Sequence, residues 1–455
     1  MTNSIQPLAE EQQLRAIPWF LASSFLNTLF ALWTFGGSIF LLFLDELGLP
    51  KGQIGAALAI FPFCGVLALW FAPIATRWGW KRVFLLGYGI RKIVMALLLL
   101  LPWVLAAAGQ TAGLILLFSI IIVFALLRAL AETAYYPWSQ ELIPRRFRGK
   151  ITGVQTITCT LSSAVALLIA GQVISHGSGL SRFLVLIAAG CCLGMLSVAV
   201  MIKMPGGAPQ PDAPAAGAHW EKMAQALRDR NFITYLCGSG CVMLGGMLFA
   251  SFLPLYVKER LGVTAGSVVM LDIAAMAGGA LSGMLMGWAA DRVGSRPVLM
   301  PAAAMALLVP LTWLLLPRQI PHVIAWCTTL YFLNGVACSG VAIAASRLLF
   351  NGVIPRQAST AYTAIHYAWI GITGGLAPLL AGGLLTLCGS WQSRIGYVVL
   401  DGQAVIFTGG FLLLTAGWWM YGLVRPDDRH TTRSVLMELL APSIRLRLLH
   451  LMIWR

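Results

Sequence analysis

Charged residues are scarce in this chain. Only 10% of its 455 residues are Asp, Glu, Lys or Arg, whereas 59% are hydrophobic, and the mean hydropathy is +0.82. A water-soluble domain of this composition would expose large apolar surfaces to water. The composition therefore excludes an ordinary soluble protein and predicts an integral membrane protein.

Catalytic and metal-binding motifs are missing as well. The sequence has no G-x-x-x-x-G-K-[ST] phosphate loop, no H-E-x-x-H helix and no G-x-S-x-G turn. Its nine cysteines include no C-x-x-C pair and no His at ligand spacing, so we interpret them as packing residues rather than as disulfides or metal ligands. We expect no enzyme, no ATP-driven pump, no cofactor and no metal.

Long apolar runs recur along the chain, each with at least about 18 residues, which is enough to cross a bilayer as a helix. We expect an all-α membrane protein with twelve transmembrane helices in two pseudo-symmetric bundles of six. The first six lie at 17–44, 54–76, 83–107, 112–140, 151–175 and 183–204, and the second six at 232–257, 263–290, 298–316, 323–350, 361–388 and 395–424.

A short motif occurs in both halves, about 215 residues apart, as ATRWGWKR at 75–82 and as ADRVGSRP at 290–297. The pairs Leu47-Gly48 and Leu261-Gly262 keep nearly the same spacing. Internal duplication of this kind is typical of membrane transporters. It divides the chain into two six-helix domains, 1–204 and 231–426, joined by a linker, 205–230.

The linker begins with a Pro/Ala/Gly-rich stretch that disfavours a helix and ends in a stretch, 220–229, that favours a short amphipathic one. Residues 427–455 alternate Leu, Ile and Met with Arg445, Arg447 and Arg455. This pattern predicts a basic amphipathic tail on the cytoplasmic membrane surface, and a partner-binding helix is the alternative.

Lys and Arg gather on one side of the membrane if the N-terminus is cytoplasmic. Only six then fall on the opposite side, namely Lys51, Arg182, Lys258, Arg260, Arg318 and Arg394. The positive-inside rule therefore places both termini in the cytoplasm, and anionic lipid accounts for the net charge of +15 without nucleic acid. We expect a monomeric, multi-pass protein of a bacterial inner (plasma) membrane.

The repeated motif resembles that of the major facilitator superfamily, which reads G-x-x-x-D-[RK]-x-G-[RK]-[RK] between helices 2 and 3 and recurs between helices 8 and 9. The second copy matches at Gly287, Asp291, Arg292, Gly294 and Arg296. The first copy keeps Arg77, Gly79, Lys81 and Arg82, but has Ala72 and Thr76 where the family prefers Gly and Asp. The resemblance extends to about Pro426 and implies two halves that alternate around a solute site at the midplane.

The motif is expected to bias the balance of inward- and outward-open states, because its acidic residue pairs with nearby arginines and its glycines permit close approach and a tight turn. Thr76 predicts that the first copy acts more weakly than the second. Glu141 and Arg148, in the loop after the fourth span, would extend this cytoplasmic network. The alternatives are that these arginines only fix topology and that the loop is merely solvated.

Ionisable residues inside the spans need a partner or a purpose, since each costs roughly 2.5–3.5 kcal/mol at a helix centre. Arg128 and Glu132 share one face of the fourth span, and the resemblance implies that this helix lines the cavity. We expect a role in substrate binding or proton coupling, with a structural pair as the alternative. Asp272 is a candidate protonation site, and Asp401 is interpreted as structural or interfacial.

Three further ionisable residues are interpreted from their positions. His366 is a weaker coupling candidate, because a lone His is often a packing residue. Arg91 and Lys92 are expected to snorkel to the cytoplasmic surface.

Uncharged polar residues on the expected cavity helices are candidate substrate contacts. They are Asn27, Tyr135, Tyr136, Tyr331, Asn334 and Trp369, of which Asn27 and Asn334 are preferred.

The sequence predicts a secondary active transporter that moves a small organic solute by alternating access, coupled to protons. One alternative is a transport-inactive membrane sensor or scaffold that works through its tail. Another is efflux of amphiphilic drugs, although the fifth span lacks the Gly-Pro motif of drug/proton antiporters. The substrate and the direction of transport stay open.

Overall fold

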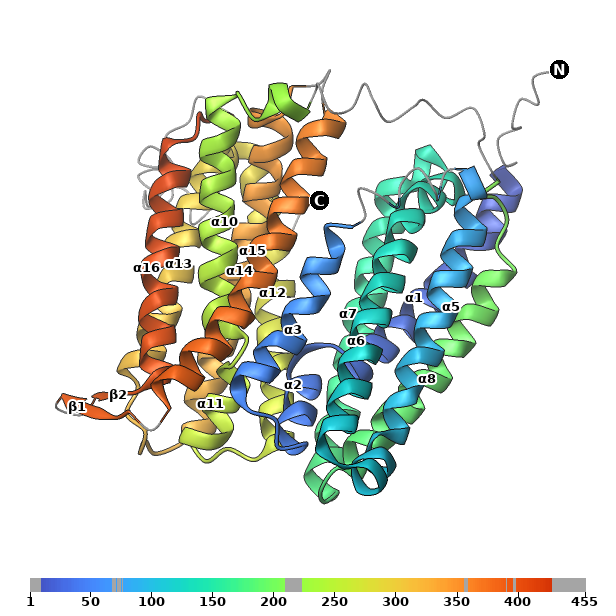
Figure 1. The fold of residues 1–455 in the computed structure, drawn as a ribbon. Helices are drawn as coiled ribbons and strands as arrows, with labels where there is room; N and C mark the ends of the chain where they lie inside the picture. The colour runs from blue at the N-terminus through green and yellow to red at the C-terminus, as the bar shows by residue number, and fades with distance from the viewer. Residues whose placement is uncertain are drawn as a thin grey trace.

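The computed structural model describes residues 10–67, 71, 75, 77–208, 223–355, 359–389, 391–395 and 398–427. Long helices dominate and form two bundles (Figure 1). Ala72, Thr76, most of the linker and the predicted tail after Asp427 lie outside the described residues.

The first bundle contains α1 (Glu10–Thr34), α2 (Gly37–Glu46), α3 (Lys51–Gly65), α5 (Trp80–Ala96), η1 (Leu97–Leu100), α6 (Leu101–Leu142), η2 (Arg145–Phe147), α7 (Arg148–His176) and α8 (Ser181–Ile202). The second contains α10 (Arg230–Ala250), α11 (Leu253–Arg260), α12 (Ala265–Val293), α13 (Ser295–Leu315), α14 (Val323–Leu348), η3 (Leu349–Val353), α15 (Ser359–Cys388), β1 (Ser393–Ile395), β2 (Val398–Leu400) and α16 (Gly402–Leu423). We call the end where α8 ends and α10 begins the linker face, and the end with β1 and β2 the hairpin face.

Ten described stretches are long and apolar enough to cross a membrane. One of them, Trp80–Leu142, has 63 residues and would be about 95 Å long as one straight helix, three times the hydrocarbon thickness. Its backbone reverses at Gly109, whose φ of 83° favours glycine, so it crosses twice (Figure 1). α3 packs along α15 and covers the first part of the predicted second span, 54–76, so the described helices fit the prediction of twelve crossings.

The first helix of each half is broken, although the sequence predicted one continuous span in each case. The first span breaks between α1 and α2 at Gly36 and Gly37, and the seventh breaks between α10 and α11 just before Pro254. Breaks at equivalent positions follow from the duplication, and glycine and proline interrupt helices for known steric reasons. The break in the first half leaves the start of α2 facing the second half.

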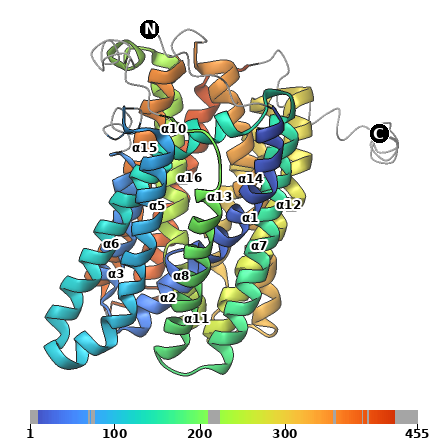
Figure 2. The ribbon, with the colours of Figure 1, turned by 90° about the vertical axis from the view of Figure 1, so that its right-hand side faces the viewer.

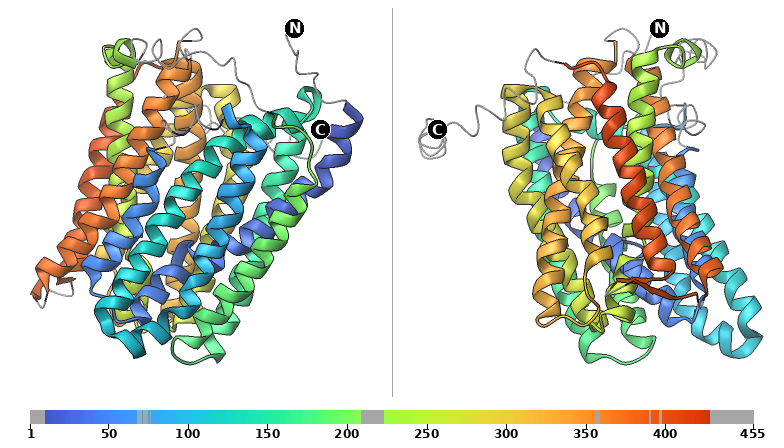
Figure 3. Two further views of the ribbon diagram at one scale, coloured as in Figure 1. Left: turned by 45° about the vertical axis from the view of Figure 1, so that its right-hand side comes forward. Right: turned by 90° about the vertical axis from the view of Figure 1, so that its left-hand side faces the viewer.

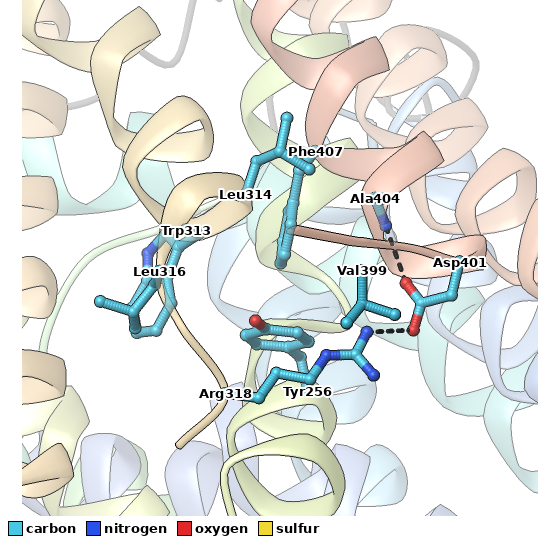
Figure 4. Close-up of a pocket in the computed structure, with 9 residues that line it drawn as sticks. All are labelled: Tyr256, Trp313, Leu314, Leu316, Arg318, Val399, Asp401, Ala404 and Phe407. Carbon is cyan, nitrogen blue, oxygen red and sulfur yellow. Dashed lines mark hydrogen bonds and ion pairs between the residues drawn. The ribbon is translucent and has the colours of Figure 1, made fainter. Parts of the chain in front are cut away.

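The last span starts later than predicted. Residues 393–395 and 398–400 pair as antiparallel strands, and α16 begins only at Gly402. Asp401 therefore lies at a helix end, where it accepts hydrogen bonds from the backbone N–H groups of Gln403 and Ala404, both at 3.1 Å. Figure 4 shows Asp401 facing Arg318, whose guanidinium is 2.5 Å away. Asp401 is thus a helix cap and ion-pair partner at the hairpin face.

Buried hydrophobic side chains show where the halves meet. The largest cluster joins both halves and includes Phe40 and Leu44 from α2 together with Leu255 from α11 and Phe407 from α16. Toward the linker face the core splits into separate clusters, one in each half. The halves are therefore packed together near the hairpin face and apart near the linker face.

Two helix pairs carry most of the contact between the halves, namely α3 with α15 and α7 with α12 (Figures 1 and 2). The α3–α15 pair is very close, because a Cβ added at Gly55 would lie 2.3 Å from the carbonyl oxygen of Pro378. Only glycine fits at this position without a backbone shift. Figure 3 shows the bundles from two further sides, with the hairpin at the end away from the linker.

We predict that Gly55→Ala lowers the melting temperature of the purified protein, because overpacking against a backbone carbonyl costs about 1–3 kcal/mol. Gly65→Ala is the matched control on the same helix, since an added Cβ there would meet no atom of another element within 4 Å among the described residues. It should leave the melting temperature unchanged or slightly higher, because alanine favours helix. Equal melting temperatures for the two variants would contradict the packing described here.

Candidate functional site

Three adjoining chambers lie between and within the two halves. The central chamber, about 530 Å³, is lined by residues of both halves, among them Arg128, Asp272 and Asn334. Arg128 also lines a polar chamber of about 310 Å³ in the first half. Met247 and Asn334 also line a largely apolar chamber of about 430 Å³ in the second half. The chambers together resemble a solute site at an interface between domains.

The polar chamber contains the pair that the sequence singled out. Arg128 and Glu132 lie one turn apart on α6, and the Arg128 Nε is 2.7 Å from Oε1 of Glu132. Asn27 of α1 lines the same chamber, as predicted for a cavity-facing polar residue. Gln155 of α7 and Tyr135 also line this chamber, and Gln155 donates to the Tyr135 hydroxyl at 3.0 Å. Neutral polar groups therefore line the chamber beside the pair.

Arg91 and Lys92 do not snorkel, so this expectation is wrong. The two residues are 5% and 0% exposed, because α5 packs against α6 and α8 and both side chains contact α1, at Asn27 and Phe30. Arg91 donates to Oδ1 of Asn27 at 3.3 Å, and Lys92 donates to the hydroxyl of Ser197 at 2.6 Å and lies 3.3 Å from the centroid of the Tyr88 ring. Hydroxyl, amide and aromatic groups replace water around both cations.

The central chamber brings together four of the predicted residues, namely Arg128, Asp272, Tyr331 and Asn334. Asp272 of α12 is half-buried and accepts hydrogen bonds from the side chain and the backbone of Ser38, at the start of α2. Tyr331 of α14 is buried, and its hydroxyl has no hydrogen-bond partner among the described residues. Asn334, one turn further along α14, lines both the central and the apolar chamber. Asp272 thus links the two halves across the chamber.

The apolar chamber holds His366 of α15, whose ring lies 5.6 Å from that of Tyr235. The Nδ1 atom of His366 is buried and has no partner among the described residues. Trp369 is not among the residues that line the three chambers, and its indole N–H donates to the carbonyl oxygen of Leu236 at 2.8 Å. That bond ties α15 to α10.

Ion pairs join the two halves at the hairpin face. Lys258 of α11 lies 2.8 Å from Asp45 of α2, and Lys51 of α3 pairs with Glu259 of α11 and with Asp45, the latter at 3.0 Å. We call these four residues the hairpin-face cluster. The sequence analysis did not predict this cluster. A signal was present, because two of the few basic residues on the non-cytoplasmic side, Lys51 and Lys258, lie next to the repeated Leu-Gly pairs.

The repeated motif at the linker face acts within each half. Gly79 and Gly294 have φ values of 93° and 92°, the turn that glycine was expected to provide. Lys81 donates to the carbonyl oxygen of Met204 at 2.5 Å, and Arg296 donates to that of Gly422. These two cations therefore occupy equivalent places, each holding the end of the last helix in its own half.

The acidic residues of the linker face also bind within their halves. Asp291 pairs with Arg347 of α14 at 3.5 Å, a partner that the sequence did not suggest. Glu141 accepts from the backbone N–H of Gly207 at 2.9 Å. Asp427 accepts from the backbone N–H of Ser295 at 3.0 Å, at the start of α13.

The remaining motif residues lie at the surface. Arg77 and Arg82 are exposed, and Arg292 lies over the ring of Trp288 at 4.6 Å. A Cβ added at Gly287 would meet no atom of another described element within 4 Å, so in this state the glycine does not serve close helix approach. The side chain of Arg148 lies outside the described residues. Among the described residues, the motif contacts at the linker face therefore stay within one half each.

The chambers are reached from the linker face. Tyr136 and Tyr367, which line the polar and apolar chambers from opposite halves, are 67% and 64% exposed. The bundles diverge toward this face in Figure 1, and the shared core and the hairpin-face cluster close the other end. The structure thus has one open and one closed side.

The family model described as Major Facilitator Superfamily matches residues 21–278 and 235–450. The chain belongs to the Major Facilitator Superfamily. A search of curated proteins finds no match.

Solved transporters of this superfamily have the same fold. A mutant of the nucleoside transporter NupG has a TM-score of 0.70 at 11% identity, covering 90% of this chain and 99% of its own. A bacterial homologue of the human lysosomal transporter Spinster, in an inward-facing and unoccupied conformation, has a TM-score of 0.67 at 14% identity, covering 96% and 100%. A D-xylose-proton symporter has a TM-score of 0.65 at 15% identity, covering 91% and 98%.

For this superfamily member we predict that removing the pairs between the halves favours opening at the hairpin face. In the double variant Lys258→Gln with Glu259→Gln, the distance between spin labels at Ser178 and Gln392 should lengthen in part of the population. Partly exposed pairs contribute about 0.2–1 kcal/mol each, so the shift should be a few-fold in population.

Glu46→Gln is the matched control, because Glu46 pairs with Arg182 of the same half at 2.9 Å. It should leave the label distance unchanged. An effect of the control equal to that of the double variant would show that the hairpin-face cluster does not hold the halves together.

Proposed function

We propose that this protein is a secondary active transporter that moves a small organic solute across the membrane by alternating access. The observation that carries the proposal is the set of chambers between two pseudo-symmetric halves, open at one face and closed at the other by contacts between the halves. A solute bound in the central chamber between Arg128 and Asn334 would contact both halves. Its binding energy can therefore shift the balance between the two open states.

The linker face is proposed to be cytoplasmic, because Arg77, Lys81, Arg82, Arg292 and Arg296 all lie there. In that orientation the structure is inward-open. A transport-inactive sensor or scaffold is less well supported, since such a protein has no need of linked chambers that reach both halves.

The function is tested by shortening the chain after Asp427, which keeps the contact of this residue with Ser295. The shortened protein in proteoliposomes should still exchange between open states, seen as two label distances for Ser178–Gln392 and for Lys150–Arg230 at opposite faces. A protein that never populates a hairpin-open state, with or without its last 28 residues, would not be a transporter of this kind.

We further propose that protons are coupled at Asp272. Its carboxylate lies where α12 of one half meets Ser38 of the other. Its protonation state therefore changes the free energy of moving the halves relative to each other. A charged group at the membrane centre costs about 2.5–3.5 kcal/mol, and protonation removes that cost when the chamber closes.

Asp272→Asn should therefore lose accumulation driven by a pH gradient while keeping solute exchange across the membrane, since the amide mimics the protonated acid. Glu46→Gln is the control, because Glu46 pairs with Arg182 of the same half and is not among the residues that line the three chambers. If Glu132→Gln rather than Asp272→Asn abolishes pH-driven accumulation, coupling is at the Arg128–Glu132 pair and not at Asp272.

A further inference from the structure

The polar chamber carries an excess of positive charge. Its described lining contains two guanidinium groups, Arg91 and Arg128, and one carboxylate, Glu132. Glu132 is already bound to Arg128 at 2.7 Å. Lys92, next to Arg91 in the chain, is fully buried, and its partners among the described residues are a hydroxyl and two aromatic rings. One cation of the lining is thus left without an ion-pair partner of its own among the described residues.

Arg91 is that cation. It is 5% exposed, its guanidinium lies 4.8 Å from the Tyr88 ring centroid, and its one hydrogen bond among the described residues is donated to Asn27. The Nε–H group is buried and has no partner among the described residues. A guanidinium presents five N–H donors in a fork that matches a carboxylate. Most of the capacity of Arg91 is therefore unused.

An unpaired buried charge is costly, so a ligand that neutralises Arg91 gains more than one that does not. A cationic solute would be repelled by the excess charge. A neutral sugar would leave the guanidinium uncompensated, and a polyanion would bring more charge than one free cation balances. A single negative charge fits.

The other end of the site is apolar. Its lining includes Met243, Phe249, Val341 and Leu414, and the chamber of about 430 Å³ opens to the central chamber at Asn334. Met side chains adapt their shape to varied apolar partners. This chamber accepts a hydrophobic body rather than a polar one.

We infer that the transported solute is an amphiphilic monocarboxylate whose carboxylate binds Arg91 and whose aromatic or aliphatic body extends toward the apolar chamber. This inference rests on the proposed transport function and names its substrate class. The first half would bind the carboxylate of the solute, and the second half would bind its hydrophobic body.

The test uses three probes with one body and different heads, namely 3-phenylpropionate, 3-phenylpropionamide and 3-phenylpropylamine. Binding to the full-length protein is measured by thermal stabilisation, and transport by uptake into proteoliposomes. The carboxylate should bind and be taken up at least about tenfold better than the amide or the amine, because hydrogen bonds to charged groups are the stronger ones.

Three variants separate the role of Arg91 from folding. Arg91→Gln should lose the preference for the carboxylate, and Arg91→Lys should keep part of it. Asn27→Asp places a fixed carboxylate beside Arg91, so it should raise the melting temperature and abolish binding of 3-phenylpropionate. Arg182→Gln removes a cation that pairs with Glu46 outside the chambers and should bind like the unmodified protein.

Preference for the amide or the amine, or a carboxylate preference that survives Arg91→Gln in folded protein, would overturn the inference. So would failure of all three probes to bind. The label distances described above report alternating access without any solute, so the transport function can stand while the substrate class fails. Their failure would instead sink the transport function itself.

Discussion

A membrane interior offers no water to charged groups, and this constraint accounts for the arrangement of nearly every ionisable residue described in the spans. Such a group either has a protein partner or borders a chamber that water and solute can enter. Lys92 has protein partners in Ser197 and Tyr88. Glu132 has a partner in Arg128 and also borders the polar chamber. Arg91 borders a chamber and lacks a full set of partners, which is why it indicates a ligand rather than a structural contact.

Composition, run length and the repeated motif were enough to predict twelve crossings, two halves and the superfamily. These features depend on local pattern, because apolar length and turn glycines act within a few residues. The breaks before α2 and α11 and the late start of α16 were not predicted, since a broken helix stays as apolar as a continuous one. Asp401 was assigned inside a span for the same reason.

The candidate site was predictable only in part. Arg128, Glu132 and Asn27 could be placed together from helix periodicity and the resemblance, and Asp272 from its isolation in an apolar run. Arg91 and Lys92 were misplaced, because their partners, Asn27 and Ser197, lie 64 and 105 residues away in the chain. Partners distant in the chain, such as Arg347 for Asp291, leave no local pattern to read.

The charges of the hairpin-face cluster stay balanced in each half after the halves separate. Lys51 touches carboxylates of both halves, so it keeps Asp45 when it releases Glu259, and the second half retains one lysine and one glutamate side by side. Neither half is left with a net charge in the cluster. These side chains are also partly exposed to solvent. Dissolved salt therefore screens the electrostatic attraction between the halves over distances of about 8–10 Å. The ion pairs therefore make a weak, reversible and salt-sensitive contribution to the closure, in addition to the hydrophobic packing between the halves.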